Sequence, residues 1–133
     1  NAVPSQLNKR ATTFEPCHFI KDTLAVSITP DPPVKNQPDL FSVSGTLTNN
    51  NITAAQTNLI VVFIDLSNST PIGDENTQPF NESYNAGIPF TINASIPIPA
   101  VDSYGILVFV GEELLTAYSC AHATVNGSAA NFF

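Results

Sequence analysis

The chain alternates short runs of β-branched and aromatic residues with clusters of proline, asparagine, glycine and aspartate. Apolar residues at helical spacing are almost absent, and the 11 prolines would interrupt helices repeatedly. Short apolar runs between turn-forming residues are typical of an all-β sandwich or barrel. The pattern predicts strands over residues 24–29, 40–48, 57–66, 89–98, 104–110 and 114–125.

Alternation of apolar and polar residues predicts which side of a strand faces the core. Three runs alternate in this way, and their predicted inward residues are Leu24, Val26 and Ile28, then Phe41, Val43 and Leu47, then Phe90, Ile92 and Ile96. The run 57–66 is apolar on both faces, so its periodicity does not identify an inward side. For this run and for 104–110 we take as inward residues Val61, Phe63, Ile106 and Val108.

The connections are rich in residues that end strands. The prolines of the Pro-Asp-Pro-Pro turn at 30–33 cannot donate to a β-ladder, and Asn-Asn-Asn at 49–51 predicts a turn. Gly-Glu-Glu at 111–113 predicts a hairpin turn between the last two runs. The polar stretch 67–87 is too long for a simple hairpin and is expected to hold one short edge strand. We therefore predict six or seven strands in one domain.

The charge balance excludes some classes of function. Charged residues are only 11% of the chain, the net charge is −7, and no lysine or arginine follows Lys35. Because nucleic-acid binding needs a basic face, we expect no nucleic-acid partner. Attraction to an anionic membrane through a polybasic patch is disfavoured for the same reason. The 43% of hydrophobic residues argues against a disordered chain.

Two cysteines and five glycosylation sequons indicate an oxidising compartment. Cys17 and Cys120 are the only cysteines, and Asn-x-Ser/Thr sequons occur at Asn51, Asn68, Asn81, Asn93 and Asn126. Disulfides persist, and sequons are glycosylated, in the secretory pathway. We therefore expect a protein that is secreted or lies in the lumen of that pathway, with its two ends tied together. The alternative is a pair of unpaired thiols in a cytosolic protein with chance sequons.

Two further features concern processing and membranes. Lys9-Arg10 is either a dibasic processing site or part of a solvated N-terminal tail. The longest apolar run, residues 59–64, is far too short to span a bilayer.

Candidate catalytic and metal-ligating residues are few. Glu112 and Glu113 are adjacent, so on a strand they would point to opposite faces and would not flank one glycosidic bond. His18 and His122 each lie within two residues of a cysteine, and a disulfide would bring the two imidazoles together. No further ligand has suitable spacing for a metal. We expect no enzyme activity, no metal and no cofactor.

Four segments in order carry a resemblance to a known family. They are Val-Ser-Ile-Thr-Pro-Asp-Pro-Pro at 26–33, Val-Ser-Gly-Thr-Leu at 43–47, Ile-Pro-Ile-Pro at 96–99, and Thr-Ala-Tyr-Ser-Cys at 116–120. Together they resemble the ML lipid-recognition family, and the fungal phosphatidylglycerol/phosphatidylinositol transfer proteins in particular. That family also includes the Niemann–Pick type C cholesterol carrier. The likeness spans residues 17–125, with tails at 1–16 and 126–133.

The resemblance implies an immunoglobulin-like β-sandwich of two antiparallel sheets that holds one lipid between them. It also implies a disulfide between the first and last cysteines, Cys17 and Cys120. This chain departs from the family in having no internal cysteine pairs and no basic residues after Lys35.

The resulting hypothesis is a secreted lipid-binding or lipid-transfer protein that contacts membranes transiently. Its ligand would be a phospholipid, a fatty acid or a sterol. The residues expected to line the cavity are Phe41, Val43, Leu47, Val61, Phe63, Phe90, Ile92, Ile96, Ile106, Val108 and Tyr118. The alternative is a glycosylated adhesion or interaction module in which the same residues form an ordinary filled core.

Overall fold

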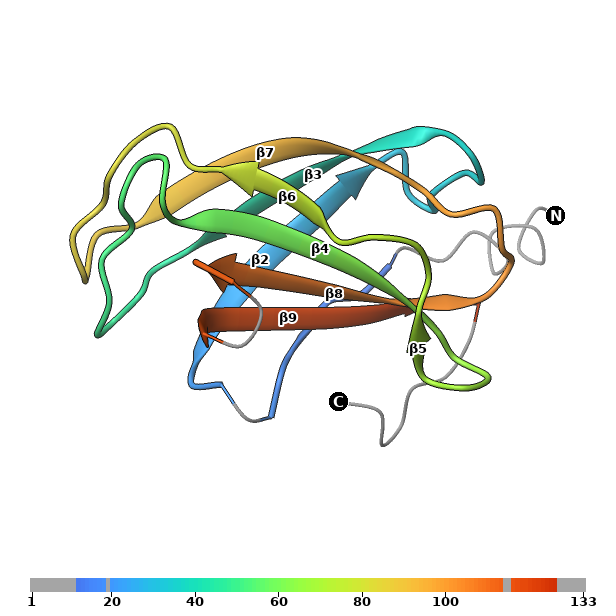
Figure 1. Cartoon of the computed structure of the whole chain (residues 1–133). Helices are drawn as coiled ribbons and strands as arrows, with labels where there is room; N and C mark the ends of the chain where they lie inside the picture. The colour runs from blue at the N-terminus through green and yellow to red at the C-terminus, as the bar shows by residue number, and fades with distance from the viewer. Residues whose placement is uncertain (1–11, 19, 114–115, 127–133) are drawn as a thin grey trace, which may run out of the picture.

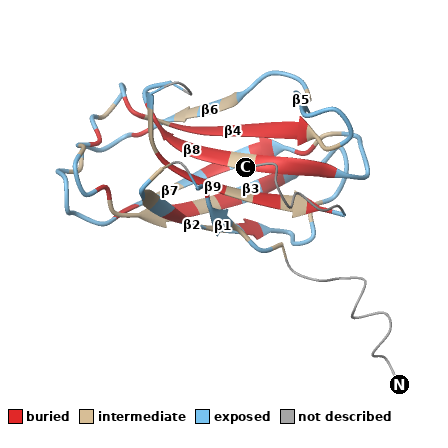
Figure 2. Cartoon of the chain, turned by 90° about the horizontal axis from the view of Figure 1, so that it is seen from below, coloured by how far each residue is buried: buried red, intermediate tan, exposed pale blue. Residues whose placement is uncertain are grey.

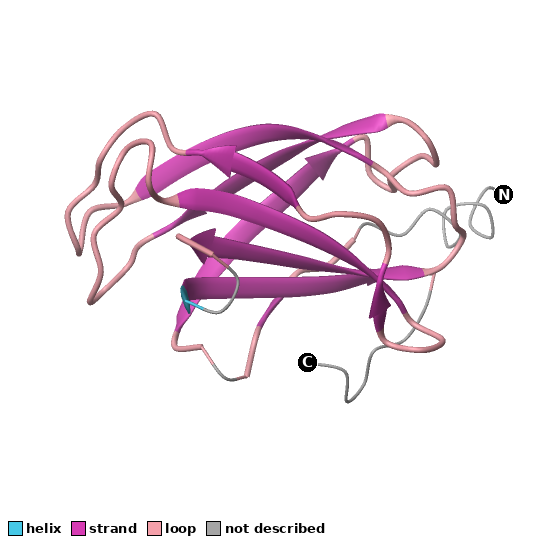
Figure 3. Cartoon of the chain, viewed as in Figure 1, coloured by secondary structure: helices cyan, strands magenta, loops and turns pink. Residues whose placement is uncertain are grey.

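The fold is all-β. A computed structural model describes residues 12–18, 20–113 and 116–126, and strands joined by loops make up almost all of this part (Figure 3). Within these ranges, no helix is long and apolar enough to cross a membrane. The processing motif Lys9-Arg10 lies outside the described residues.

Nine strands are present among the described residues (Figure 1). Six of them contain eight or nine residues and match the six runs expected from the sequence, with ends shifted by up to three residues. The strands are β1 (Glu15–Pro16), β2 (Asp22–Thr29), β3 (Pro38–Gly45), β4 (Asn58–Asp65), β5 (Thr70–Pro71), β6 (Asn76–Pro79), β7 (Phe90–Pro97), β8 (Tyr104–Gly111) and β9 (Ala117–Val125).

The strands form two ladders that join at one point. In the β3 ladder, β3 lies between β2 and β7 and pairs antiparallel with both. In the β8 ladder, β8 lies between β4 and β9, and β5 and β6 pair with the free edge of β4. The ladders meet where β2 and β9 pair in parallel, at Asp22 with Ser119 and at Thr23 with Cys120. The whole is one curled, mixed sheet whose two ladders share a core.

The strand count and pairing differ from the prediction of six or seven strands in two antiparallel sheets. The additional strands are β1, β5 and β6, which have only two to four residues. Strands this short contain no repeat of the alternating pattern, so periodicity does not reveal them. The stretch 67–87 contains β5 and β6 rather than one edge strand. Residues 15 and 16, assigned above to a tail, pair with β9.

The core lies between the two ladders. Buried residues from β2, β3 and β7 pack against buried residues from β4, β8 and β9 in one cluster. A second cluster lies on the opposite face of β4 and β8, where Cys17 and Ile20 of the N-terminal segment pack against it. As a consequence, β4 and β8 are buried along most of their length (Figure 2).

Candidate functional site

All eleven residues predicted to line a cavity belong to the core between the ladders. Nine of them are at most 4% exposed, and Ile92 and Tyr118 are half-buried and pack against the others. Their expected inward orientation is therefore confirmed, including that of Val61, Phe63, Ile106 and Val108 on the two ambiguous strands. The other apolar residues of β4, such as Ile60 and Val62, belong to the second cluster. Whether the eleven contact a ligand stays a prediction.

The edge of the core between β6 and β7 is not closed by strand pairing. In the described part of the chain, β6 pairs only with β4, and β7 pairs only with β3. Two hollows occur along this edge, and each is lined by residues from the β6 side and from the β7 side. We refer to this unpaired edge as the β6–β7 seam.

The larger hollow, which we call the Phe63 hollow, has a volume of about 370 Å³. Its apolar residues include Phe63 and Ile98, which are core residues, and Ile72, which packs against the core. The carboxyl-bearing residues Asp74 and Glu75 are exposed and also line it. The hollow therefore combines an apolar floor with an acidic rim.

The smaller hollow, which we call the Tyr84 hollow, has a volume of about 250 Å³. It is lined in part by Phe80, Tyr84 and Ile92. The rings of Phe80, Tyr84 and Phe90 pack with centroids 5.6–6.4 Å apart, mostly edge to face. Aromatic packing of this kind stabilises one end of the seam beyond the effect of area burial.

The sequence prediction missed several residues at the seam. Ile72, Phe80 and Tyr84 are isolated apolar residues in the polar stretch 67–87, where no periodicity marks them. Ile98 had a usable signal, because it continues the alternation of Ile92 and Ile96 beyond the end of β7.

The core also contains an acidic side chain. Asp39 on β3 is 1% exposed, and neither of its carboxyl oxygens has a hydrogen-bond partner among the described residues. Burial raises the pKa of Asp39 to about 6, with a further contribution from the negative charge of Asp31. Burial, and then the charge of Asp39, raise the pKa of Tyr104 to about 12. Asp39 and Tyr104 are therefore electrostatically coupled at one end of the core.

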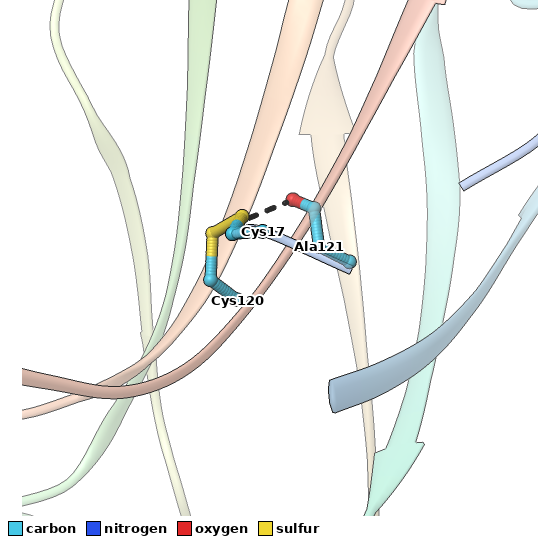
Figure 4. The surroundings of a disulfide bond; sticks show 3 residues. All are labelled: Cys17, Cys120 and Ala121. Carbon is cyan, nitrogen blue, oxygen red and sulfur yellow. Dashed lines mark hydrogen bonds between the residues drawn. A yellow bond between two sulfur atoms is a disulfide. The ribbon is translucent and has the colours of Figure 1, made fainter. Parts of the chain in front are cut away.

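Cys17 and Cys120 form a disulfide, with their Cα atoms 5.5 Å apart (Figure 4). Both residues are buried, and the carbonyl oxygen of Ala121 lies 4.0 Å from Sγ of Cys120. The bridge attaches the N-terminal segment to β9 and confirms the expected tie between the two ends of the domain.

The two histidines lie near this bridge. The pKa of His122 is lowered mainly by burial, with opposing contributions from Glu15, which raises it, and His18, which lowers it. The charge of His18 thus acts on His122, and a paired site formed by the two imidazoles stays a prediction. Among the described residues, no group of three or more histidine, cysteine, aspartate or glutamate side chains is arranged to hold a metal ion.

The remaining candidate residues are at the surface. Glu112 and Glu113 are exposed in the turn between β8 and β9. The asparagines of all five sequons are also exposed, so attached glycans would extend into solvent: Asn51, Asn68, Asn81, Asn93 and Asn126.

Comparisons with known proteins identify no family. No protein-family model matches the chain, and no curated protein matches it. Among solved structures, the chain is similar to chicken MD-1 in complex with lipid IVa, with 14% identity and a TM-score of 0.48. That alignment covers 86% of this chain and 88% of MD-1.

Proposed function

We propose that this protein is a secreted lipid-binding and lipid-transfer protein that holds one lipid by its apolar part between the two ladders. The observation that carries the proposal is the β6–β7 seam, where the shared apolar core reaches solvent at the Phe63 hollow. The sequence resemblance to the ML lipid-recognition family agrees with it. Binding requires no covalent step, so we propose no enzymatic activity.

The size of the Phe63 hollow favours a slender ligand. At about 370 Å³ it is near the lower end of the range for small-molecule pockets, which is roughly 300–1,000 Å³. Each methylene group removed from water contributes about 0.8 kcal/mol, so one acyl chain or sterol supplies most of a useful affinity. A larger ligand requires the ladders to separate at the seam, where no strand pairing between β6 and β7 has to break.

Secretion is part of the same proposal. The disulfide between Cys17 and Cys120 and the exposure of all five sequon asparagines are both compatible with the secretory pathway. In that environment, a single closed domain with a lipid inside would exchange its ligand with membranes during transient contact.

The test is lipid capture by variants that fill one hollow. We expect native mass spectrometry of the wild-type protein, incubated with oleyl alcohol or cholesterol, to show a complex with one bound ligand. Ile72→Trp should fill the Phe63 hollow and weaken binding at least about tenfold, whereas Ile92→Trp tests the Tyr84 hollow. The matched control is Ile88→Trp, because Ile88 is 51% exposed and lines neither hollow.

Two results would overturn the proposal. One is a folded wild-type protein that retains no lipid or sterol of any kind. The other is wild-type affinity in both Ile72→Trp and Ile92→Trp, which would place binding away from the seam.

The alternative function, a glycosylated adhesion or interaction module, is favoured by one observation. Phe41, Val43, Val61, Ile106 and Val108 are 0% exposed, which is the behaviour of an ordinary packed core. Under this alternative, the protein binds no lipid, and Ile92→Trp lowers stability by about 1–3 kcal/mol through overpacking. Chemical denaturation of the Ile92→Trp variant, together with the lipid-capture experiment, separates the two functions.

A further inference from the structure

Asp39 occupies a position that the strand pattern assigns to an apolar residue. Asp39, Phe41 and Val43 lie on the same side of β3, and all three are buried in the core. In the β3 ladder, Asp39 pairs with Ile96 of β7, which is also buried. A carboxyl group at this position lowers the stability of the fold unless something compensates for its burial.

The protein supplies little compensation for this carboxyl group. Neither carboxyl oxygen of Asp39 accepts a hydrogen bond from any residue that the structure describes. The nearby lysine in the sequence, Lys35, is engaged in an ion pair with Asp102. Asp31, the charged group that acts on Asp39, is itself negative, and Asp31 accepts hydrogen bonds from Thr12. Two buried acceptor oxygens are thus left available to a hydrogen-bond donor.

The carboxyl group lies at the same end of the core as the Phe63 hollow. Pro38, the residue before Asp39, pairs with Pro97, and the N–H of Ile98 donates to the carbonyl oxygen of Gln37 over 3.0 Å. Pro97 and Ile98 both line the hollow. On the opposite ladder, the ring of Tyr104, which senses the charge of Asp39, packs edge to face on Phe63 with centroids 5.7 Å apart. Phe63 lines the hollow as well.

We propose that Asp39 is a polar anchor inside the lipid site, which accepts a hydrogen bond from a hydroxyl or ammonium group at the polar end of the bound lipid. This inference rests on the proposed lipid-binding function and specifies the ligand class. The apolar part of the lipid would lie along the β6–β7 seam, with Phe63 and Ile98 beside it. A ligand with a free carboxylate is disfavoured, because its charge repels Asp39 and the acidic rim at Asp74 and Glu75.

The test uses ligands that share a tail and differ only in the donor. We would measure the binding of 1-tetradecanol, tetradecylamine and tetradecyl methyl ether, each delivered from cyclodextrin, to the full-length protein. The wild-type protein should bind the alcohol and the amine at least about tenfold more tightly than the ether, because a hydrogen bond to a charged group is involved. Asp39→Leu should bring the alcohol-to-ether ratio close to one while retaining ether binding.

The controls separate this inference from the function on which it rests. Asp39→Asn keeps an acceptor oxygen and should retain part of the preference for the alcohol. Glu113→Gln removes a carboxylate in an exposed turn and should leave the ratio unchanged. An unchanged ratio in Asp39→Leu overturns the anchor but leaves lipid binding intact. Failure of the wild-type protein to bind any of the three ligands overturns the anchor, and failure to bind cholesterol or any other lipid as well overturns the lipid-binding function.

Discussion

The outer faces of the two ladders differ sharply in chemistry. The outer face of the β3 ladder is polar and carries exposed residues such as Ser27, Thr91 and Asn93. The outer face of the β8 ladder is apolar, and Ile60, Val62 and Phe109 on it are at most 8% exposed. Half-buried strands show clean alternation, whereas strands buried on both faces show continuous apolar runs. The β8 ladder thus needs a cover on its outer side, and the β3 ladder does not.

The covering segment explains the position of the disulfide. Cys17 and Ile20 pack on the outer face of the β8 ladder, and Glu15–Pro16 extends the pairing along β9. A segment of this length forms few contacts and would dissociate readily if it were held by them alone. The bond between Cys17 and Cys120 holds it in place.

Removal of the disulfide should have the largest effect on stability, because it releases the segment that covers the outer face of the β8 ladder. The double variant Cys17→Ala with Cys120→Ala should lose about 4–5 kcal/mol of unfolding free energy, because the bridge closes a loop with a sequence separation of 103. Urea unfolding monitored by circular dichroism measures the loss. As a control on the polar face, Ser27→Ala with Thr91→Ala should change stability by no more than about 1 kcal/mol in total. A loss below about 1 kcal/mol in the cysteine variant would contradict this account of the cover.

Asp39 is the exception to the alternation of the β3 ladder, and its titration gives the second prediction. Its pKa is about 6 in the folded protein, against 3.8 for the ordinary group. The folded state therefore holds this proton more tightly than the unfolded state. The stability contribution is fully present below about pH 4 and is lost as the pH rises through about 6.

The measurement compares the wild-type protein with Asp39→Asn. Urea unfolding between pH 4 and pH 8 should show the wild type losing on the order of 2–3 kcal/mol relative to the variant as the pH rises. The control is Asp65→Asn, because the hydroxyl and backbone N–H of Ser67 lower the pKa of Asp65 from its ordinary value of 3.8. Its contribution to stability is lost only at pH values below this range, so Asp65→Asn should run parallel to the wild type from pH 4 to pH 8. Parallel pH profiles for the wild type and Asp39→Asn would show that burial does not raise the pKa of Asp39 in the folded state.

The contrast between the ladders also marks the limit of what the sequence predicts. The inward residues of β2, β3 and β7 follow from alternation, because one side of these strands faces solvent. The inward side of β4 is not readable from its sequence, since its outer face is covered by a segment some 40 residues earlier in the chain. The sequence of β4 is equally compatible with either face pointing inward, and the structure places the face with Val61 and Phe63 in the core.

The candidate site was less predictable than the fold. The β6–β7 seam depends on which strands end up at the free edges of the two ladders, and that order is set by pairings between distant segments. Asp39 follows Pro38, and the predicted strand begins only at Leu40, so Asp39 lies outside the predicted strand. Leu40 is 48% exposed and Asp39 is buried, so the polarity of these two residues is inverted relative to their environment.

Two opposite substitutions, one on each outer face, compare the polarity of the two faces directly and should change stability by a smaller amount. Val62→Thr places a hydroxyl on the covered face of β4, where it should lower the unfolding free energy by about 1–2 kcal/mol. Thr91→Val makes the opposite change on the exposed face of β7 and should alter stability by at most about 0.5 kcal/mol. Valine and threonine have nearly the same shape, so thermal unfolding of the two variants isolates the polarity of each face. Equal effects at both positions would show that the outer face of β4 is open to water.

The smallest expected effect concerns a glycan on the polar face. Asn93 on β7 pairs with Ser42 of β3 and is exposed, so a glycan attached there would lie outside the sheet. In protein secreted from a eukaryotic host, Asn93→Gln should remove one glycan mass and change stability by at most about 0.5 kcal/mol.

Asn126→Gln is the informative comparison, because Nδ2 of Asn126 donates to the carbonyl oxygen of Asp102 over 2.9 Å. Loss of that bond should lower stability by about 0.5–1.5 kcal/mol in addition to removing any glycan. Intact-mass spectrometry measures the loss of a glycan, and thermal unfolding measures the loss of the hydrogen bond. An unchanged glycan mass in Asn93→Gln would show that Asn93 carries no glycan.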